Sequence, residues 1–236
     1  MMKKHTAVLL AAVFAAALAT EASAQDGSAY DWSGFYVGGN VGYGFADSDW
    51  VLVNNASGHS TGDIGKTQTS PEFEGMLGGI QIGRNWQDDK IVYGLEAALT
   101  IPDLEGYGTW TNSSGYFRDA SSDINWIASL TGRGGMTFDK TLVYGKAGLA
   151  FAGVDYTHTG GQPGQVRHFE GSETTLGVIV GAGVEQALTD KWSLKFDYSF
   201  TYLGINNTEV SEGGRTAVFN VDQGIHSLAV GVNYRF

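Results

Sequence analysis

The segment LAVGVNYRF, residues 228–236, alternates strictly between two kinds of side chain. One set of positions is apolar or aromatic: Leu228, Val230, Val232, Tyr234 and Phe236. The intervening set is small or polar: Ala229, Gly231, Asn233 and Arg235. Because successive side chains of a strand point to opposite faces, this pattern predicts a strand with one apolar and one polar environment.

Seven further segments repeat this alternation along the chain. They lie around residues 35–45, 76–86, 91–99, 126–136, 142–153, 178–185 and 194–200. Their lengths are close to the roughly 9–11 residues that a tilted membrane strand needs. A soluble lipocalin-type barrel would place mostly charged side chains opposite the apolar ones, whereas here those positions hold mainly glycine, alanine, asparagine and a few charges of both signs. We therefore expect an all-β fold, an eight-stranded antiparallel up-and-down transmembrane β-barrel.

The connections between these segments alternate between short and long. Tight polar turns are expected at Asp88-Asp89, Asp139-Lys140 and Asp190-Lys191. Long stretches lie near 47–72, 102–123, 155–173 and 206–222, and they contain Pro71, Pro102 and Pro163. Short turns on one side and long loops on the other are typical of outer-membrane barrels, whose long loops face the exterior.

The N-terminus has the features of an export signal. Lys3 and Lys4 precede an uncharged run of 14 residues from Ala7 to Thr20, and Ala22-Ser23-Ala24 follows as a small-residue cleavage site. The run is too short to span a bilayer as a helix. We expect residues 1–24 to be a cleaved signal peptide, with residues 25–236 forming the barrel and its four long extracellular loops.

Composition excludes several classes of function. The formal net charge is −11, which argues against a nucleic-acid partner because such binding needs clustered positive charge. The chain has no cysteine, which excludes disulfides, thiolate metal sites and cysteine nucleophiles. No motif of a hydrolase, metalloprotease or phosphate-binding loop is present, and neighbouring His226 and Ser227 would point to opposite faces of one strand. We expect no enzymatic activity, no cofactor and no metal site.

The expected inward faces collect seven charged side chains: Glu96, Arg133, Lys146, Glu185, Lys195, Asp197 and Arg235. Charges in so narrow a space must pair to offset their desolvation. Since an eight-stranded barrel is just wide enough for side chains to fill it, a plug of ion pairs is the favoured interpretation. A narrow gated pore, in which the ion pairs exchange partners, is the alternative.

The expected outward faces have aromatic residues toward the strand ends. These positions are Trp32, Phe45, Trp86, Trp126, Trp192, Tyr202 and Tyr234. Aromatic rings favour the level of the lipid headgroups, so these residues predict two girdles. Arg84 departs from the apolar pattern of this face, and near the interface its aliphatic stem can extend toward the headgroups.

The four long loops hold fourteen acidic residues against four basic ones. Such a charge block is usually a solvated surface. We also consider that these acidic loops contact a host or environmental ligand, or that divalent cations bridge their carboxylates to lipopolysaccharide phosphates.

The C-terminal strand ends on an aromatic residue at the last position, as bacterial outer-membrane proteins do. Together with WSGFYVGG (32–39), GIQIGRNW (79–86), GAGVE (181–185) and LTDKWSLK (188–195), it resembles the alphaproteobacterial outer-membrane barrel family, which is related to the OmpA transmembrane domain and opacity-type porins. The resemblance implies insertion into the outer membrane by the barrel-insertion machinery, which would recognise Leu228, Val230, Val232, Tyr234 and Phe236.

The family includes surface antigens and haemin-binding proteins. A structural role in the envelope combined with surface contact, in association with outer-membrane lipid and lipopolysaccharide, is therefore the favoured function. A small porin-like channel is one alternative, and a haemin-binding surface protein is another. For the last, the resemblance suggests these iron ligands: His59, His158, His168, Tyr107 and Tyr116.

Overall fold

The computed structural model describes residues 30–55, 72–105, 108–111, 117–162, 165–203, 207–212 and 215–236. These residues form ten strands: β1 (Gly34–Asn55), β2 (Glu72–Asp88), β3 (Ile91–Glu105), β4 (Gly108–Thr111), β5 (Phe117–Phe138), β6 (Thr141–Gln162), β7 (Gln165–Ala187), β8 (Trp192–Leu203), β9 (Asn207–Glu212) and β10 (Arg215–Arg235). Within these ranges, no helix has the length and apolar character needed to cross a membrane. The predicted signal peptide, residues 1–24, lies outside the described residues.

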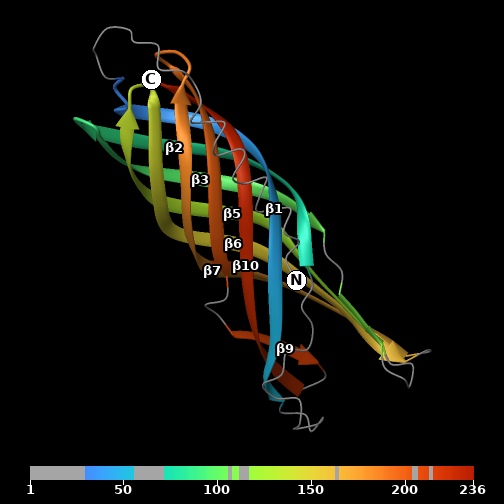
Figure 1. Cartoon of the computed structure of the whole chain (residues 1–236). Coiled ribbons are helices and arrows are strands. Elements are labelled where there is room, and N and C mark those ends of the chain that lie inside the picture. Colours follow the sequence, from blue (N-terminus) through green and yellow to red (C-terminus); the bar gives the residue numbers. More distant parts are fainter. Residues whose placement is uncertain are drawn as a thin grey trace, which may run out of the picture. The chain divides into compact units, whose positions relative to one another are not determined.

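Eight of the strands form one closed ring. Each pairs antiparallel with its neighbours in the order β1-β2-β3-β5-β6-β7-β8-β10, and β10 returns to β1 (Figure 1). The short strands β4 and β9 pair with β5 and β10 and lie off the ring. The predicted eight-stranded antiparallel barrel is therefore confirmed. Closure leaves no unpaired sheet edge in the ring, which a sheet surrounded by lipid requires.

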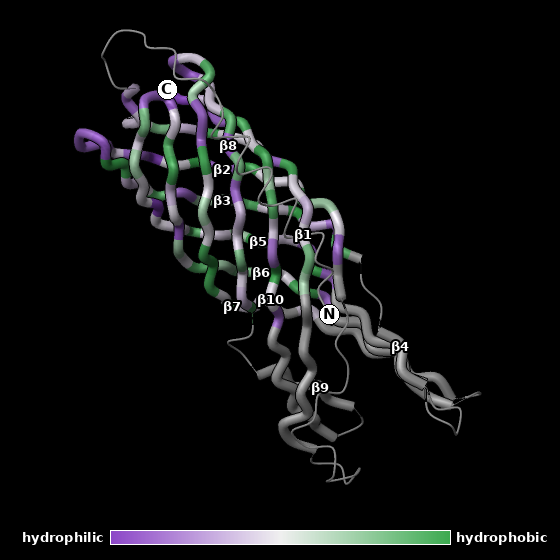
Figure 2. Tube along the Cα trace, in the orientation of Figure 1, coloured by the Kyte–Doolittle hydropathy of each residue, from purple (hydrophilic) through white to green (hydrophobic). Residues whose placement is uncertain are grey.

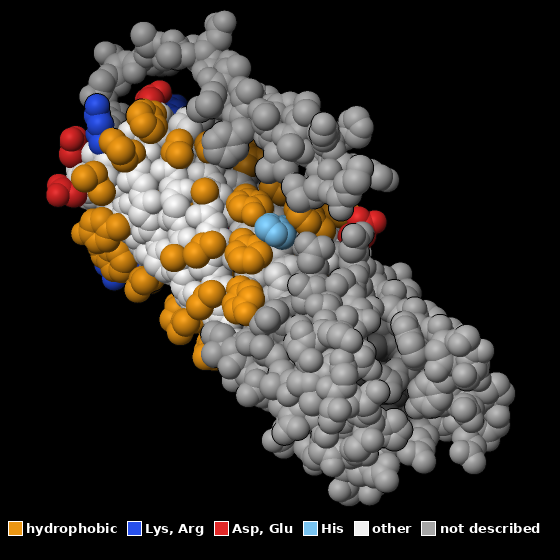
Figure 3. Space-filling view, turned by 60° about the horizontal axis from the view of Figure 1, so that its bottom comes forward, with side chains coloured by type: hydrophobic (Ala, Val, Ile, Leu, Met, Phe, Trp, Pro, Cys, Tyr) orange, Lys and Arg blue, Asp and Glu red, His pale blue; other side chains and the backbone are white. Residues whose placement is uncertain are grey.

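The two faces of the barrel wall differ as the alternation predicts. Side chains at outward positions are exposed and apolar, for example Val41, Ile80 and Leu130, whereas inward residues of the same strands are buried. Figure 2 shows this change between apolar and polar residues along the strands, and Figure 3 shows apolar side chains gathered on the described surface. An apolar exterior around a buried interior that holds the polar residues is what a barrel surrounded by lipid requires.

Short turns connect the strands at one end of the barrel. They occupy residues 89–90 and 139–140, and a bend at 188–191 joins β7 to β8. Asp89 and Asp139 have positive φ values of 51° and 56°. Aspartate tolerates this left-handed conformation better than most residues, which explains the acidic residue in both turns.

The opposite connections differ from the prediction in length. β6 and β7 continue through most of the stretch 155–173, with backbone pairing as far as Gln162 and Gln165. Strand pairing thus extends well beyond the roughly 9–11 residues that cross a membrane.

Pro102 is the second difference, because it lies inside β3 rather than in a loop. The pairing of β3 with β5 ends at Thr100 and Ile127, so Pro102 lies beyond it. On that side of β3 the missing N–H costs no ladder hydrogen bond, and the proline is accommodated. Pro71 and Pro163 lie outside the described residues.

Candidate functional site

All seven charged residues expected inside the barrel lie on its inner face. Six of them are buried, and Lys146 is nearly so. They come from strands β3, β5, β6, β7, β8 and β10, in the half of the barrel nearer the short turns. Sequence alone left their pairing open, and the structure shows it for six of the seven.

Arg133 and Glu96 form the centre of this network. Arg133 Nη1 lies 3.1 Å from Glu185 Oε2 and 3.8 Å from Glu96 Oε2. Lys195 Nζ lies 3.3 Å from the same Glu96 oxygen. Each buried charge thus has an opposite charge beside it, which is the condition for burying them at tolerable cost.

Neutral polar side chains extend the hydrogen bonding of Glu185 and Arg133. Ser193 Oγ and Asn233 Nδ2 both donate to Glu185 Oε1, at 2.5 and 2.8 Å. Asn85 Oδ1 accepts from Arg133 Nε at 2.9 Å, and Gln81 Nε2 donates to Asn233 Oδ1 at 2.8 Å. The predicted network contained only charged residues and so left out these four, although their inward phase and polar character mark them.

Lys146 and Asp197 form a second group. Lys146 Nζ lies 2.5 Å from Asp197 Oδ1. The carboxylate also accepts hydrogen bonds from Tyr144 Oη at 2.6 Å and Ser199 Oγ at 2.9 Å. Three donors on one carboxylate hold it in a single position.

Two tyrosines enclose the Arg133 guanidinium. Its Cζ lies 4.7 Å from the Tyr36 ring centroid and 5.1 Å from that of Tyr144. Each ring packs on an inward glycine of the next strand, since a Cβ at Gly83 would lie 2.3 Å from Tyr36 and one at Gly183 2.5 Å from Tyr144. These glycines therefore provide the space in which the rings lie against the wall.

The short-turn end of the interior is covered by Trp32, which was predicted to be a girdle residue. That prediction is wrong, because Trp32 is completely buried. Its Nε1 donates to Thr137 Oγ1 at 3.2 Å, and the Arg235 guanidinium lies 4.7 Å from its ring centroid. Trp32 precedes the first strand, so strand alternation does not fix where its side chain points.

A layer of apolar side chains fills the interior nearer the long loops. Every strand of the ring contributes to it: Ala46, Leu77, Leu104, Ile124, Ile127, Ala150, Ala152, Val154, Ile179, Leu203 and Ile225. Sequence reasoning missed this apolar layer. The available signal was two adjacent apolar residues, as at Met76-Leu77 and Val178-Ile179, which place one on each face of the wall.

On the outer face, aromatic residues gather at the strand ends. Trp192 and Tyr234 are in edge contact, with ring centroids 5.0 Å apart. The Arg84 guanidinium lies 4.8 Å from the centroid of Phe35 and 5.1 Å from that of Trp86. The alternating residues of the proposed insertion signal lie in the last strand and at its end: Leu228, Val230, Val232, Tyr234 and Phe236.

The residues considered for catalysis do not come together. His226 Nδ1 lies 2.8 Å from Tyr198 Oη, and its ring stacks on Phe45 with centroids 5.1 Å apart. Ser227 Oγ instead donates to the Ser199 carbonyl, at 3.5 Å. The two neighbouring side chains thus lie on different faces of the wall and have different partners.

The residues considered for haemin lie outside the described side chains. They are His59, His158, His168, Tyr107 and Tyr116. Among the side chains that are described, no three His, Asp or Glu residues are grouped to hold a metal ion.

Comparison with known proteins places this barrel among bacterial surface proteins. The family model of the outer membrane protein beta-barrel domain matches residues 7–236. The 31 kDa outer-membrane immunogenic protein of Brucella melitensis is 30% identical, with 87% of this chain and 84% of that protein covered. The 22 kDa outer membrane protein of Rhizobium leguminosarum is 28% identical, with 86% and 78% covered.

Among solved structures, the outer membrane protease OmpT from Escherichia coli aligns over 90% of this chain and 99% of its own. The TM-score is 0.53 at 6% identity, a likeness of fold alone. The family match and the relatives agree on one location, the outer membrane. This chain belongs to the outer-membrane β-barrel protein family.

Proposed function

We propose that this protein is a closed, non-conducting barrel that supports the envelope structurally and presents its acidic loops for surface contact. The observation that supports this most directly is the filled interior. An ion-pair network and the apolar layer lie one after the other along the same lumen. An ion passing through would have to separate buried ion pairs and then lose its hydration in an apolar constriction.

The same arrangement weighs against a porin-like channel. A channel needs a continuous polar path, whereas the apolar layer receives a side chain from each of the eight ring strands. The arrangement also argues against a catalytic role, because His226 and Ser227 lie on different faces of the wall and do not pair with each other. The barrel therefore serves best as an anchor for what lies outside the membrane.

The partners in this proposal follow from the apolar outer face of the barrel and from the acidic composition of the long-loop sequences. Its apolar outer face contacts outer-membrane lipid and lipopolysaccharide, and the acidic loops offer a surface for a host or environmental ligand. The C-terminal strand would be read by the barrel-insertion machinery through its outward aromatic and apolar residues.

Solute entry into proteoliposomes tests the proposal. Vesicles containing the refolded chain 25–236 should swell no faster in a small sugar than empty vesicles, and the Lys146→Glu variant should behave in the same way. Swelling by the wild-type protein at a rate changed by Lys146→Glu would instead show that the lumen conducts and that its charges line the path.

A further inference from the structure

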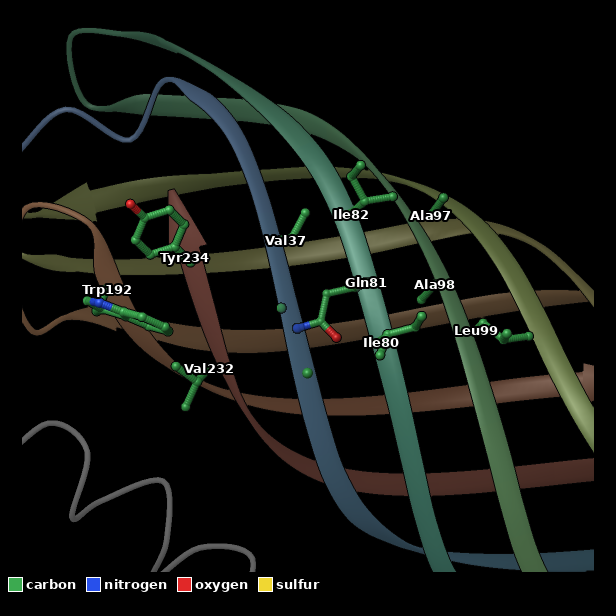
Figure 4. Close-up of a pocket in the computed structure, with 12 residues that line it drawn as sticks. Val37, Ile80, Gln81, Ile82, Ala97, Ala98, Leu99, Trp192, Val232 and Tyr234 are labelled. Carbon is green, nitrogen blue, oxygen red and sulfur yellow. The ribbon is translucent and has the colours of Figure 1, made fainter. Parts of the chain in front are cut away.

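The outer face of the barrel has an apolar groove near the short-turn end. It is an open depression with a volume of about 740 Å³. Its lining comes from five successive strands of the ring: Leu99 of β3, Ile80 and Ile82 of β2, Val37 of β1, Val232 of β10 and Trp192 of β8 (Figure 4). These side chains are between a third and two thirds exposed, so the groove is open to the lipid phase.

Gly39 explains why the wall is hollow at this point. It pairs with Val232 on one side and Ile80 on the other, and both partners line the groove. A Cβ at Gly39 would meet only the carbonyl oxygen of Gly79, at 3.7 Å, an ordinary contact distance. The backbone therefore does not require glycine here, and the missing side chain leaves a space that a hydrocarbon chain can enter.

Two cations lie at the short-turn edge of this groove. Arg84 occupies the next outward position on β2 after Ile82, and its guanidinium lies against the rings of Phe35 and Trp86. Lys191 directly precedes Trp192, and its Nζ lies 3.5 Å from Tyr234 Oη. Since Asp190 adjoins Lys191, the positive character of this edge rests chiefly on Arg84.

The surroundings of Arg84 leave its charge available to a ligand. Its guanidinium contacts the two aromatic rings. No Asp or Glu among the described residues lies within ion-pair distance of it. Aromatic rings of a membrane barrel lie at the headgroup level, so this guanidinium lies at the depth of the lipid phosphates. A guanidinium fork matches two phosphate oxygens, so Arg84 alone can hold a phosphate group.

We propose that this groove binds an anionic phospholipid of the periplasmic leaflet, with one acyl chain over Gly39 and the phosphate held by Arg84. The short-turn end of such barrels faces the periplasm, where the leaflet consists of phospholipid. The two features that a phospholipid needs, an apolar groove for its acyl chain and a cation at headgroup depth for its phosphate, thus lie on one surface.

Native mass spectrometry of the refolded chain 25–236 tests the proposal. The protein is titrated in detergent with palmitoyl-oleoyl phosphatidylglycerol or with the phosphatidylcholine of the same acyl chains. The phosphatidylglycerol should bind at least about fivefold more tightly, because only its headgroup has a net negative charge. Arg84→Gln should remove this preference, whereas Lys140→Gln, at another short turn, should preserve it.

Filling the groove provides the second arm. Gly39→Leu should weaken binding of both lipids at least about fivefold. Gly78→Leu is the matched control, because Gly78 lies outside the groove lining and a Cβ there meets nothing within 4 Å. Heat-modifiable mobility on gels confirms that each variant is folded.

Three results would overturn the proposal. They are equal binding of the two lipids, equal effects of Gly39→Leu and Gly78→Leu, and displacement of phosphatidylglycerol by excess glycerol 3-phosphate. The first two would mean ordinary annular lipid, and the third a site for a free phosphate.

Discussion

At the scale of single residues, Arg133 is the side chain on which most interior contacts converge. It pairs with Glu185 and Glu96, hydrogen bonds to Asn85 and lies between two tyrosine rings. Among the described residues, Arg133→Met removes the only ion-pair partner of Glu185 and one of the two of Glu96. We expect the free energy of unfolding to fall by about 3–5 kcal/mol, the usual cost of breaking a buried pair.

Urea unfolding in lipid vesicles, followed by tryptophan fluorescence, measures this loss. Lys146→Met is the comparison, because Lys146 is less buried than Arg133 and pairs with one carboxylate, whereas Arg133 lies between two. Its cost should be smaller, about 1–3 kcal/mol. Equal losses in the two variants would contradict the central position assigned to Arg133.

The glycines of the wall give a second prediction at this scale. Gly83→Ala would place a Cβ 2.3 Å from Tyr36, so the ring must move away from Arg133 and Glu96. Gly134→Ala on the outer face meets nothing within 4 Å. We expect Gly83→Ala to lower the unfolding free energy by about 1–3 kcal/mol, as overpacking does, and Gly134→Ala to raise it by about 0.5–1 kcal/mol. The same urea titration measures both changes in unfolding free energy. A stabilising effect of Gly83→Ala would contradict the packing of the Tyr36 ring on Gly83.

The pairing of these residues shows where sequence reasoning ends. Period-two alternation was enough to predict which charges face inward, because it depends on one strand at a time. The contact of Glu96 with Lys195 joins β3 to β8 across the lumen. It depends on the stagger of all strands around the ring, which no single segment specifies.

At the scale of elements, the C-terminal strand combines a structural and a proposed sorting role. Phe236 is 74% exposed, so Phe236→Ala should change the stability of the refolded barrel by less than about 0.5 kcal/mol. If the insertion machinery reads this residue, the amount of folded protein in the outer membrane of cells should nevertheless fall severalfold.

Cell fractionation compared with unassisted refolding separates the two effects. Phe138→Ala is the matched control, since Phe138 is 60% exposed and ends β5 at the same side of the barrel. A similar reduction in both variants would indicate loss of membrane contact rather than of a terminal signal.

The strands themselves were largely predictable, and their ends were not. Alternation located all eight ring strands, because each faces two different environments along its membrane-crossing part. Toward the long loops this contrast fades, and the continuation of β6 and β7 left no such pattern. Pro102 was expected in a loop because proline usually ends a strand. Proline is excluded only where the sheet needs its N–H, and Pro102 lies beyond the pairing with β5.

At the scale of the whole molecule, the proposed non-conducting lumen has two closures in series. The ion-pair network fills the half near the short turns, and the apolar layer fills the half near the long loops. The network could be anticipated from charges on the inward faces. Adjacent apolar residues mark some members of the apolar layer in the sequence, but these members become a single layer only when eight strands close.

Single-channel conductance in planar bilayers tests this most directly. It compares the wild type, a network variant (Arg133→Ala with Glu185→Ala), an apolar-layer variant (Leu77→Ala with Leu104→Ala) and the combination of all four changes, each shown to be folded by its heat-modifiable mobility. Two closures in series predict that the first three proteins are silent and that only the combined variant gives discrete openings. Openings in the wild type, or in the network variant alone at the size seen in the combination, would contradict the account.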